Sequence, residues 1–422
     1  MLILTPVLKR LVKKGRLVVR SPGWREECFG PGGDTGPEVT VRFARSSVAR
    51  RIARDPALGA AEAYMEGDLQ IVGDDIEALL ELVSLNARWT YDNRARGGIA
   101  ETGRALNRLY QRNKPRIARR NVAHHYDLSD RLYDLFLDAD RQYSCAYYRP
   151  GVEDLETAQH DKKAHIAAKL LLEEGQHVLD IGCGWGGMAL YLNRVAGVQV
   201  TGVTLSEEQL AVARRRAAEA DVADQVRFEL IDYRQLPGRY DRIVSVGMFE
   251  HVGVPQYRTF FGKIRDLLTE DGVALIHTIG RADGPGETDS FTRKYIFPGG
   301  YAPALSEIAP AIENEYLWIT DIEVLRLHYA KTLDAWLRRT KFAREEIVRL
   351  FDERFYRMWL FYLAGSRGAF ENGGHMNLQI QLSRHRDAVP LTRDYMFDAE
   401  RRLLQSSAEG AAGSASEAAT PS

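Results

Sequence analysis

Residues 177–187 read HVLDIGCGWGG, an apolar run that passes directly into a glycine-rich turn. Gly182, Gly184 and Gly187 fall where a parallel strand is expected to give way to a helix, and glycines there let a ligand lie close to the backbone. Such a match alone is weak, because the glycines could simply tighten the turn or belong to a dinucleotide-binding fold. Asp180, just before them, adds a carboxylate that is well placed to hold an amino group.

Four more apolar runs follow this one and alternate with helical segments. They are VQVTGV (198–203), VRFELI (226–231), DRIVSV (241–246) and GVALIHTI (272–279). Repetition of strand and helix predicts a doubly wound parallel sheet whose ligand lies at the carboxyl edge. The fold class expected is therefore α/β and Rossmann-like.

The glycine turn and its strand resemble the first motif of class I S-adenosylmethionine methyltransferases, which implies that S-adenosylmethionine is the cofactor. One departure is that the second strand ends in GVTLS (202–206) and lacks the acidic residue that usually binds the ribose. Thr204 and Gln209 would take that role. At the end of the third strand, Asp232 can accept from the adenine amino group and Tyr233 can pack on the ring. Alternatively, Asp232 caps a helix.

Composition bounds the remaining possibilities. The chain has 422 residues, of which 45% are hydrophobic and 27% charged, as expected for a globular protein of two domains. The first residues do not resemble a secretory signal, and no run reaches the roughly 20 apolar residues of a membrane span. Cys28, Cys145 and Cys183 lie far apart, which favours neither a disulfide framework nor a metal site. A cytoplasmic protein is expected.

The chain divides into four segments. Residues 1–87 show strand and helix patterns of a small α/β domain, with Ser47 and Asp74 as candidate helix N-caps. Residues 88–120 carry ten basic and two acidic residues, which favours an anionic surface or merely a solvated linker. Residues 121–404 form the sheet-containing domain. The small-residue tail, 405–422, is expected to be disordered.

A set of longer motifs narrows the reaction. They are EAYMEGDL, HHYDLSDRLYDLFLD, RQYSCAYY, VGMFEHVG, LIHTIG and RKYIFPGG, and they occur in this order over nearly the whole chain. Together they resemble the cyclopropane fatty-acid synthase and mycolic-acid cyclopropane synthase family. The resemblance implies a cyclopropane-fatty-acyl-phospholipid synthase, which adds the methyl carbon of S-adenosylmethionine across the double bond of an unsaturated acyl chain.

That chemistry needs a dry pocket and a base, because methyl transfer leaves a cation on the acyl chain and ring closure removes a proton from the new methyl group. The resemblance implies that the base is a bicarbonate ion held by Cys145, Glu250, His277 and Tyr329, with the Ile279 backbone as a further donor. Glu250 would also orient His277. Each side chain has a plainer interpretation as a core residue or a cap.

The resemblance also places Tyr126, Tyr143 and Ser144 around the cofactor's sulfonium and carboxylate. Residues 281–317 interrupt the sheet pattern and are expected to form, with the helices after residue 329, the lid of an acyl-chain tunnel. Its candidate lining residues, each of which could instead be core, are Phe249, Tyr295, Phe297, Trp336, Trp359 and Phe361.

Partners and products follow from the same resemblance. The N-terminal domain is expected to dock peripherally on the inner face of the membrane, at a phospholipid bilayer, and to mediate a homodimer. Nucleic acid is disfavoured, because aromatic residues are sparse in the basic segment. Alternatives are a methyl-branched or methylenated fatty acid, methylation of a small-molecule amine, and a catalytically silent lipid-binding protein.

Overall fold

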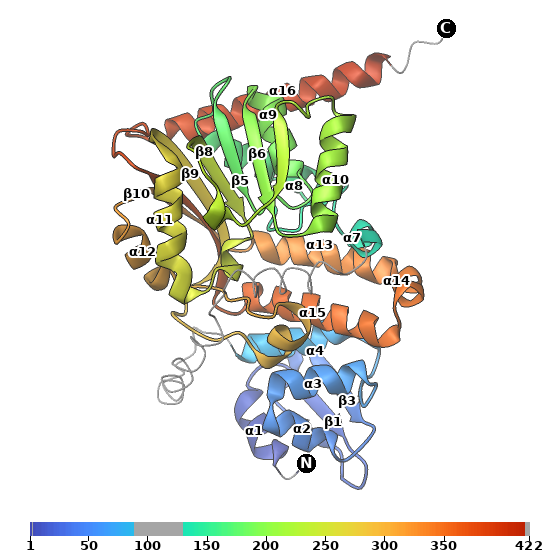
Figure 1. Ribbon diagram of the computed structural model, residues 1–422. Coiled ribbons are helices and arrows are strands. Elements are labelled where there is room, and N and C mark those ends of the chain that lie inside the picture. The colour runs from blue at the N-terminus through green and yellow to red at the C-terminus, as the bar shows by residue number, and fades with distance from the viewer. Residues whose placement is uncertain (2, 88–129, 418–422) are drawn as a thin grey trace.

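The computed structural model describes the backbone of residues 1, 3–87 and 130–417, with side chains to residue 405. Two units lie end to end: a small N-terminal unit and a larger unit built around a long sheet (Figure 1). The basic segment 88–120 and Tyr126 fall outside the described residues, so the predictions made for them stay predictions.

The N-terminal unit is a four-stranded sheet covered by helices. Its strands lie in the order β2-β1-β3-β4, with β1 and β3 parallel. In chain order its elements are α1 (Leu4–Leu11), β1 (Arg16–Arg20), β2 (Glu27–Phe29), β3 (Glu38–Phe43), α2 (Val48–Arg54), α3 (Pro56–Met65), β4 (Leu69–Ile71) and α4 (Ile76–Asn86). The predicted small α/β architecture of residues 1–87 matches this arrangement.

Helix starts in this unit follow their capping residues. Asp55 accepts from the backbone N–H of Leu58 and Pro56 occupies the first turn, so α3 begins where sequence chemistry favours it. The cap of α4 is Asp75, not the predicted Asp74, whose φ of +55° puts it outside the helix. Ser47 does precede α2, but its side chain makes no capping hydrogen bond.

The larger sheet has seven strands among the described residues, in the order β10-β11-β9-β8-β5-β6-β7. Five of them are parallel and match the five predicted runs: β5 (His177–Ile181), β6 (Gln199–Thr204), β7 (Val226–Leu230), β8 (Tyr240–Val246) and β9 (Leu268–Arg281). The strand order reverses at β5, so its carboxyl end opens the crevice where such sheets bind ligands.

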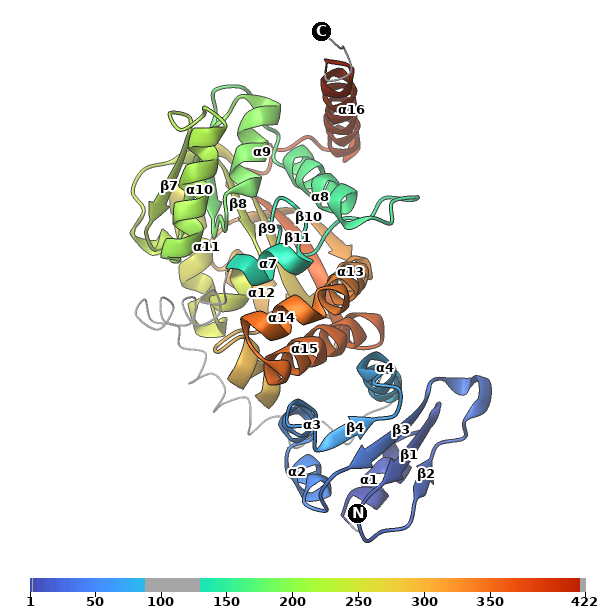
Figure 2. The ribbon, with the colours of Figure 1, turned by 90° about the vertical axis from the view of Figure 1, so that its right-hand side faces the viewer.

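Two antiparallel strands extend this sheet beyond the five that the apolar runs predict. They are β10 (Trp318–Leu325) and β11 (His375–Ser383), and β11 pairs with β9. Helices cover both faces of the sheet (Figure 2), namely α8 (Leu155–Lys169), α9 (Gly187–Ala196), α10 (Glu207–Glu219), α11 (Tyr257–Leu267), α12 (Leu305–Glu313) and α16 (Asp394–Glu417). Four more helices lie beyond its carboxyl edge, toward the N-terminal unit (Figure 1): α7 (Asp130–Phe136), α13 (His328–Phe342), α14 (Arg344–Leu350) and α15 (Glu353–Glu371).

The C-terminal boundary differs from the prediction. Helix α16 runs to Glu417, well into the segment 405–422 that was expected to be disordered. The physical reason is that alanine has the highest helix propensity, and this tail is rich in it. Low hydrophobicity excludes a core there but does not exclude a helix.

The two units share one hydrophobic cluster. Leu82 and Met65 of the N-terminal unit belong to the same cluster as Trp359 and Leu363 of α15, and α15 packs against both α3 and α4. Ion pairs reinforce the contact: Glu77 binds Lys341 at 2.7 Å and Arg367 at 2.8 Å, and Lys294 binds Glu62 at 2.7 Å. The N-terminal unit is therefore held firmly against the helices α13–α15 of the larger unit.

Candidate active site

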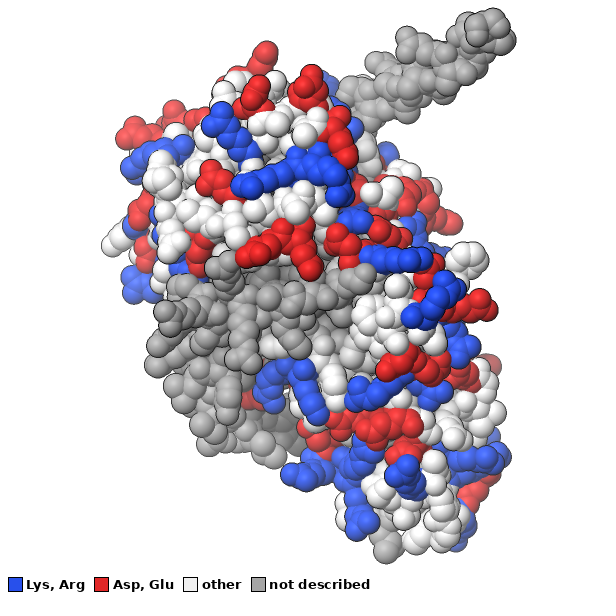
Figure 3. Space-filling view, turned by 45° about the vertical axis from the view of Figure 1, so that its right-hand side comes forward, with Lys and Arg blue, Asp and Glu red and all other residues white. Residues whose placement is uncertain are grey.

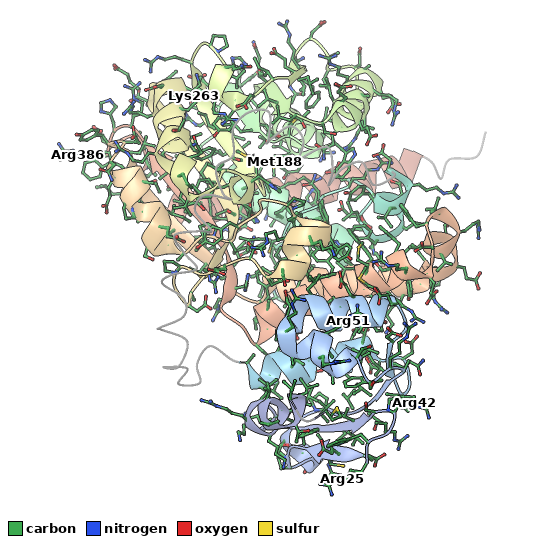
Figure 4. The ribbon with its side chains drawn as sticks, turned by 60° about the horizontal axis from the view of Figure 1, so that its bottom comes forward. Arg25, Arg42, Arg51, Met188, Lys263 and Arg386 are labelled. Carbon is green, nitrogen blue, oxygen red and sulfur yellow. The ribbon has the colours of Figure 1, made fainter. Side chains whose placement is uncertain are left out.

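The glycine turn after β5 is required by close packing as well as by conformation. Gly182 has φ of +82°, and a Cβ there would lie 2.8 Å from Cβ of Met248. A Cβ on Gly187 would lie 2.4 Å from Nε2 of Gln142. Helix α9 starts directly after the turn, with Met188 in its first turn (Figure 4). Its N-terminal N–H groups therefore face the crevice, as in sites for anionic ligand groups.

A cavity of about 160 Å³ lies at the carboxyl ends of β5, β6, β7 and β8. It is lined by nine of the ten predicted cofactor-binding residues: Tyr143, Ser144, Asp180, Gly182, Gly184, Thr204, Gln209, Asp232 and Tyr233. The tenth, Tyr126, is outside the described residues. The structure thus brings together residues that are up to 90 positions apart in the chain.

Asp180 is one of the ionisable groups that line this cavity. It is buried, and no described residue makes a hydrogen bond to its Oδ2. Burial raises its pKa to about 7, with the opposing charge of Lys162 offsetting part of the shift. A buried carboxylate oxygen without a partner fits a cationic ligand group, so Asp180 suits the amino group of a methionine moiety.

Lys162, which the sequence analysis missed, supports the same cavity from α8. It is fully buried and donates to Gln142 Oε1 at 2.5 Å and to Ser144 Oγ at 2.9 Å. Burial lowers its pKa to about 8. The lysine lies inside a mostly polar helix sequence, DKKAH, which carries no signal of its burial.

The ribose and adenine side of the cavity differs in part from expectation. Thr204 and Gln209 lie together, joined by a hydrogen bond of 3.1 Å, where the missing acidic residue would have been. Asp232 caps the short helix after β7, as its alternative interpretation had it, and also forms a forked pair with Arg234, with distances of 2.8 and 2.5 Å. Its carboxylate is thus already engaged with a guanidinium, which the sequence prediction did not include.

A second cavity, of about 740 Å³, adjoins the first. The two share Tyr143, Ser144, Gly247 and His251 in their walls. All five predicted catalytic residues line the larger cavity: Cys145, Glu250, His277, Ile279 and Tyr329. The thiol, carboxylate, imidazole and phenol are therefore brought to one place beside the cofactor pocket.

Glu250 has one engaged and one free oxygen. Its Oε1 accepts the backbone N–H of Ile279 at 2.6 Å, and no described residue makes a hydrogen bond to its Oε2. This corrects the prediction for Ile279, whose N–H serves the carboxylate instead of remaining available to an anion. Burial raises the pKa of Glu250 to about 7.

His277 is held by two amide side chains that the sequence analysis missed. Its Nε2 lies 3.2 Å from Asn377 Nδ2 and its Nδ1 lies 3.2 Å from Gln379 Nε2. The prediction that Glu250 orients this ring is therefore wrong, because β11 supplies the partners of both nitrogens. Burial, together with the charges of Lys162 and Lys169, lowers the pKa of His277 to about 3 and keeps the ring neutral.

Cys145 and Tyr329 complete the group. The Cys145 thiol is buried and donates to the Ala146 carbonyl at 3.3 Å, and burial raises its pKa well above its usual range, so it stays protonated. Tyr329 is buried at the start of α13 with its ring edge-on to Trp336 and Phe370. The Tyr329 hydroxyl is a donor type that suits an anion, whereas the Cys145 S–H would have to turn from the Ala146 carbonyl to reach one.

Only two of the predicted tunnel residues line the larger cavity, namely Phe297 and Phe361. Phe249, Trp336 and Trp359 are instead buried in the core, and the Tyr295 hydroxyl donates to Glu62 at 2.9 Å. Residues of the segment 281–317, predicted as a lid, do line the cavity: 287–289, 291, 292, 297 and 300–302. The sequence alone does not show which of these aromatic side chains line the cavity and which pack in the core.

The larger cavity extends into the N-terminal unit, which the sequence analysis did not foresee. Its wall there is almost entirely apolar and comes from α1, the sheet and α4: Leu4, Leu8, Leu11, Leu17, Val19, Val41, Phe43, Leu79, Leu80 and Val83. A cavity that is apolar along its length and polar at one end suits a long hydrocarbon chain with its reacting carbon at Glu250 and His277.

Comparisons with known proteins agree with this geometry. A family model described as mycolic acid cyclopropane synthetase matches residues 113–380. The chain is 35% identical over 407 residues to a probable fatty acid methyltransferase of Pseudomonas putida, covering 93% of this chain and 99% of the relative. It is 36% identical over 345 residues to the cyclopropane-fatty-acyl-phospholipid synthase of Escherichia coli K12, covering 82% and 87% of the two chains.

Solved structures give the same picture. Mycolic acid cyclopropane synthase CmaA1 complexed with SAH and CTAB matches with a TM-score of 0.60 at 33% identity, covering 63% of this chain and 97% of that one. The fold and the cofactor pocket thus define a class I S-adenosylmethionine-dependent methyltransferase. Within that class, the chain belongs to the family of cyclopropane fatty-acid and mycolic acid synthases.

Proposed function

We propose that this enzyme is a cyclopropane-fatty-acyl-phospholipid synthase. The observation that carries the proposal is the apolar cavity of about 740 Å³ that ends at Cys145, Glu250, His277 and Tyr329 beside the cofactor pocket. S-adenosylmethionine, when bound, supplies an activated methyl group. Tyr143 and Ser144, which line both cavities, would lie at the boundary between cofactor and acyl chain.

We further propose a bicarbonate ion as the base. The free oxygen of Glu250 can accept a hydrogen bond from the single O–H of that ion, while neutral His277 and the Tyr329 hydroxyl can each donate to it. The Cys145 thiol would donate to it after turning from the Ala146 carbonyl. When bound, it supplies an acceptor for the proton whose loss closes the ring. The surrounding protein excludes water, which would otherwise capture a cation on the acyl chain.

The product distinguishes this function from its alternatives. The Pseudomonas putida relative is named a fatty acid methyltransferase, so a branched, acyclic product is the second candidate. We expect vesicles of monounsaturated phospholipid, incubated with enzyme and methyl-labelled S-adenosylmethionine, to yield labelled cyclopropane fatty acids in gas chromatography and mass spectrometry. Labelled acyclic methyl or methylene products would favour the second candidate, and label only in added amines would reject both.

Reaction with phospholipid requires contact with a bilayer, and we propose that α1 provides it. Leu4 and Leu8 on its inner side line the cavity, whereas Ile3 and Val7 are 62% and 51% exposed. The cations Lys9, Arg10 and Lys13 are exposed beside them. Helices that combine exposed apolar side chains with cations bind the surface of anionic bilayers.

The charges elsewhere on the N-terminal unit are mixed. Arg25 and Arg42 project outward from the N-terminal unit (Figure 4), but positive and negative side chains alternate over both units on the face shown in Figure 3. The helix α1 combines three features: cations, exposed apolar groups and the wall of the acyl cavity. The predicted homodimer stays a prediction.

Replacing Val7 with glutamate is expected to weaken binding to anionic phospholipid vesicles about tenfold, because it removes roughly 1.5 kcal/mol of apolar burial and adds a repelled charge. Vesicle flotation at several salt concentrations measures this, and wild-type binding is expected to fall as salt rises. Val72→Glu is the matched control, since Val72 is 61% exposed on the turn after β4. Equal binding of the two variants would remove α1 from the proposal.

A further inference from the structure

Strand β11 carries a row of buried polar side chains. Asn377, Gln379 and Gln381 are at most 1% exposed, and they alternate with Leu378 and Ile380, which pack in an apolar cluster on the other face of the sheet. Burying amides is costly unless each finds a partner. The hydrogen-bond partners of these three amides therefore indicate their role.

Gln379 is fixed in orientation by Lys169. The Lys169 ammonium donates to Gln379 Oε1 at 2.7 Å, and both groups are buried. An ammonium can only donate, so the oxygen of this amide must face Lys169 and the NH₂ group must face the other way. The NH₂ group lies 3.2 Å from Nδ1 of His277.

This orientation determines where the proton of His277 lies. Because Gln379 donates to Nδ1, that nitrogen carries the lone pair, and the neutral ring has its hydrogen on Nε2. Nε2 faces Asn377, whose Oδ1 has no hydrogen bond among the described residues. A half-turn of that amide lets Oδ1 accept from Nε2–H. His277 and Asn377 both line the acyl cavity, so this hydrogen is also available to a ligand there.

Lys169 is itself clamped by charged neighbours. It pairs with Glu323 of β10, and Glu323 also binds His165 Nε2 at 2.6 Å. The charged groups that act on His277 are thus Lys162, His165 and Lys169 from α8 and Glu323 from β10. Burial opposes the charged form of His165, but its hydrogen bonds to Glu323 and Glu400 outweigh this and raise its pKa.

We infer that Gln379, held by Lys169, is a positioning residue that keeps His277 in the Nε2–H tautomer, so that the ring presents a hydrogen-bond donor to the reaction cavity. This inference rests on the proposed function for its consequence in catalysis. The tautomer itself can be tested without turnover.

The experiment compares Gln379→Leu and Gln379→Glu with Gln381→Leu. Gln381 lies two residues along the same buried row, but its amide donates to the Lys169 carbonyl and to Tyr395, not to His277. Leucine at 379 removes the donor to Nδ1, and glutamate reverses it into an acceptor. Nitrogen-15 NMR of histidine-labelled protein, with His277 assigned from the His277→Asn spectrum, reports which ring nitrogen is protonated.

In wild-type enzyme we expect the proton of His277 on Nε2 from pH 6 to 9. Glutamate at 379 is expected to shift it to Nδ1, and leucine to give a mixture. Both variants are expected to lower kcat roughly 10- to 100-fold with little change in KM, as for other groups that orient a histidine. The Gln381→Leu variant is expected to keep the Nε2–H tautomer, and its turnover corrects for loss of packing.

A wild-type His277 protonated on Nδ1 would overturn the inference, even if neither Gln379 variant folds. So would Gln379 variants whose tautomer and kcat match those of Gln381→Leu. Absence of a cyclopropane product from the wild type, with His277 on Nε2–H, would instead reject the proposed function and leave the tautomer assignment standing.

Discussion

Replacing Glu250 with glutamine is expected to lower the rate of cyclopropane formation by roughly 10²- to 10⁴-fold, the usual range for a group that moves a proton. Glutamine keeps a carbonyl oxygen for the Ile279 N–H, which Glu250 accepts at 2.6 Å, so the local structure is retained. It cannot take up a proton. The loss is therefore expected in kcat, with the affinity for the cofactor unchanged.

The measurement is the initial rate of labelled cyclopropane formation, together with calorimetric titration of S-adenosylhomocysteine. Glu313→Gln, at an exposed position on α12, is the control for the same chemical change on the surface. A Glu250→Gln enzyme that retained more than half of the wild-type rate would contradict the role assigned to the carboxylate.

The same carboxyl group predicts a pH dependence. Burial raises its pKa to about 7, and only the ionised form accepts a proton. Wild-type kcat/KM is therefore expected to rise as the pH increases through about 7. Asp180 also has a pKa of about 7, so the pH profile of the Asp180→Asn variant is needed to distinguish the two carboxyl groups. If Glu250 causes the pH dependence, kcat/KM of that variant still rises through pH 7.

Replacing Asp180 with asparagine is expected to weaken cofactor binding about 10- to 100-fold. A hydrogen bond to a charged group contributes roughly 1.5–3 kcal/mol, and Asp180 Oδ2 is the buried, unpartnered acceptor among the residues that line the cofactor cavity. Calorimetric titration with S-adenosylhomocysteine measures the change. Asp224→Asn, at an exposed position, serves as the control, and equal affinities for the two variants would contradict the assignment.

The same substitution is expected to stabilise the protein without ligand. The pKa of Asp180 rises from 3.8 in the unfolded chain to about 7 in the folded protein, so its ionisation costs on the order of 4 kcal/mol of folding free energy. Because the raised pKa favours the folded state only while the group is protonated, this cost grows as pH rises from about 4 to about 7. The thermal midpoint of Asp180→Asn should therefore exceed that of wild type by more at pH 8 than at pH 5.

The sequence predicts the parallel part of the sheet well because four of its strands, β5, β6, β8 and β9, are mostly buried and rich in apolar residues. The edge strand β7 alternates buried and exposed residues, which is also a strand pattern. Strand β11 escapes this reasoning: in HMNLQIQLS only every second residue is apolar, and the polar ones look like a solvated face. They are buried instead, and so the amides that hold His277 were missed. Five predicted catalytic residues line one cavity because long motifs fix their order and spacing.

What sequence reasoning could not supply were contacts between distant segments. Lys162 lies in a polar helix sequence, and only tertiary structure shows that it reaches Gln142 and Ser144. The Ile279 N–H was assigned to an anion because nothing in the sequence places Glu250 within 2.6 Å of it.

Among the described residues, no helix is both long enough and apolar enough to span a bilayer.

The apolar end of the acyl cavity has a consequence for selectivity. CmaA1 matches only 63% of this chain while 97% of its own length is covered, whereas here Val41 and Leu79 of the N-terminal unit also line the cavity. Under the proposed function, the N-terminal unit, which supplies none of the proposed reacting groups, thus bounds part of the space for the hydrocarbon tail. Substitutions in that unit would then alter the length of acyl chain accepted while leaving the proposed reacting groups in place.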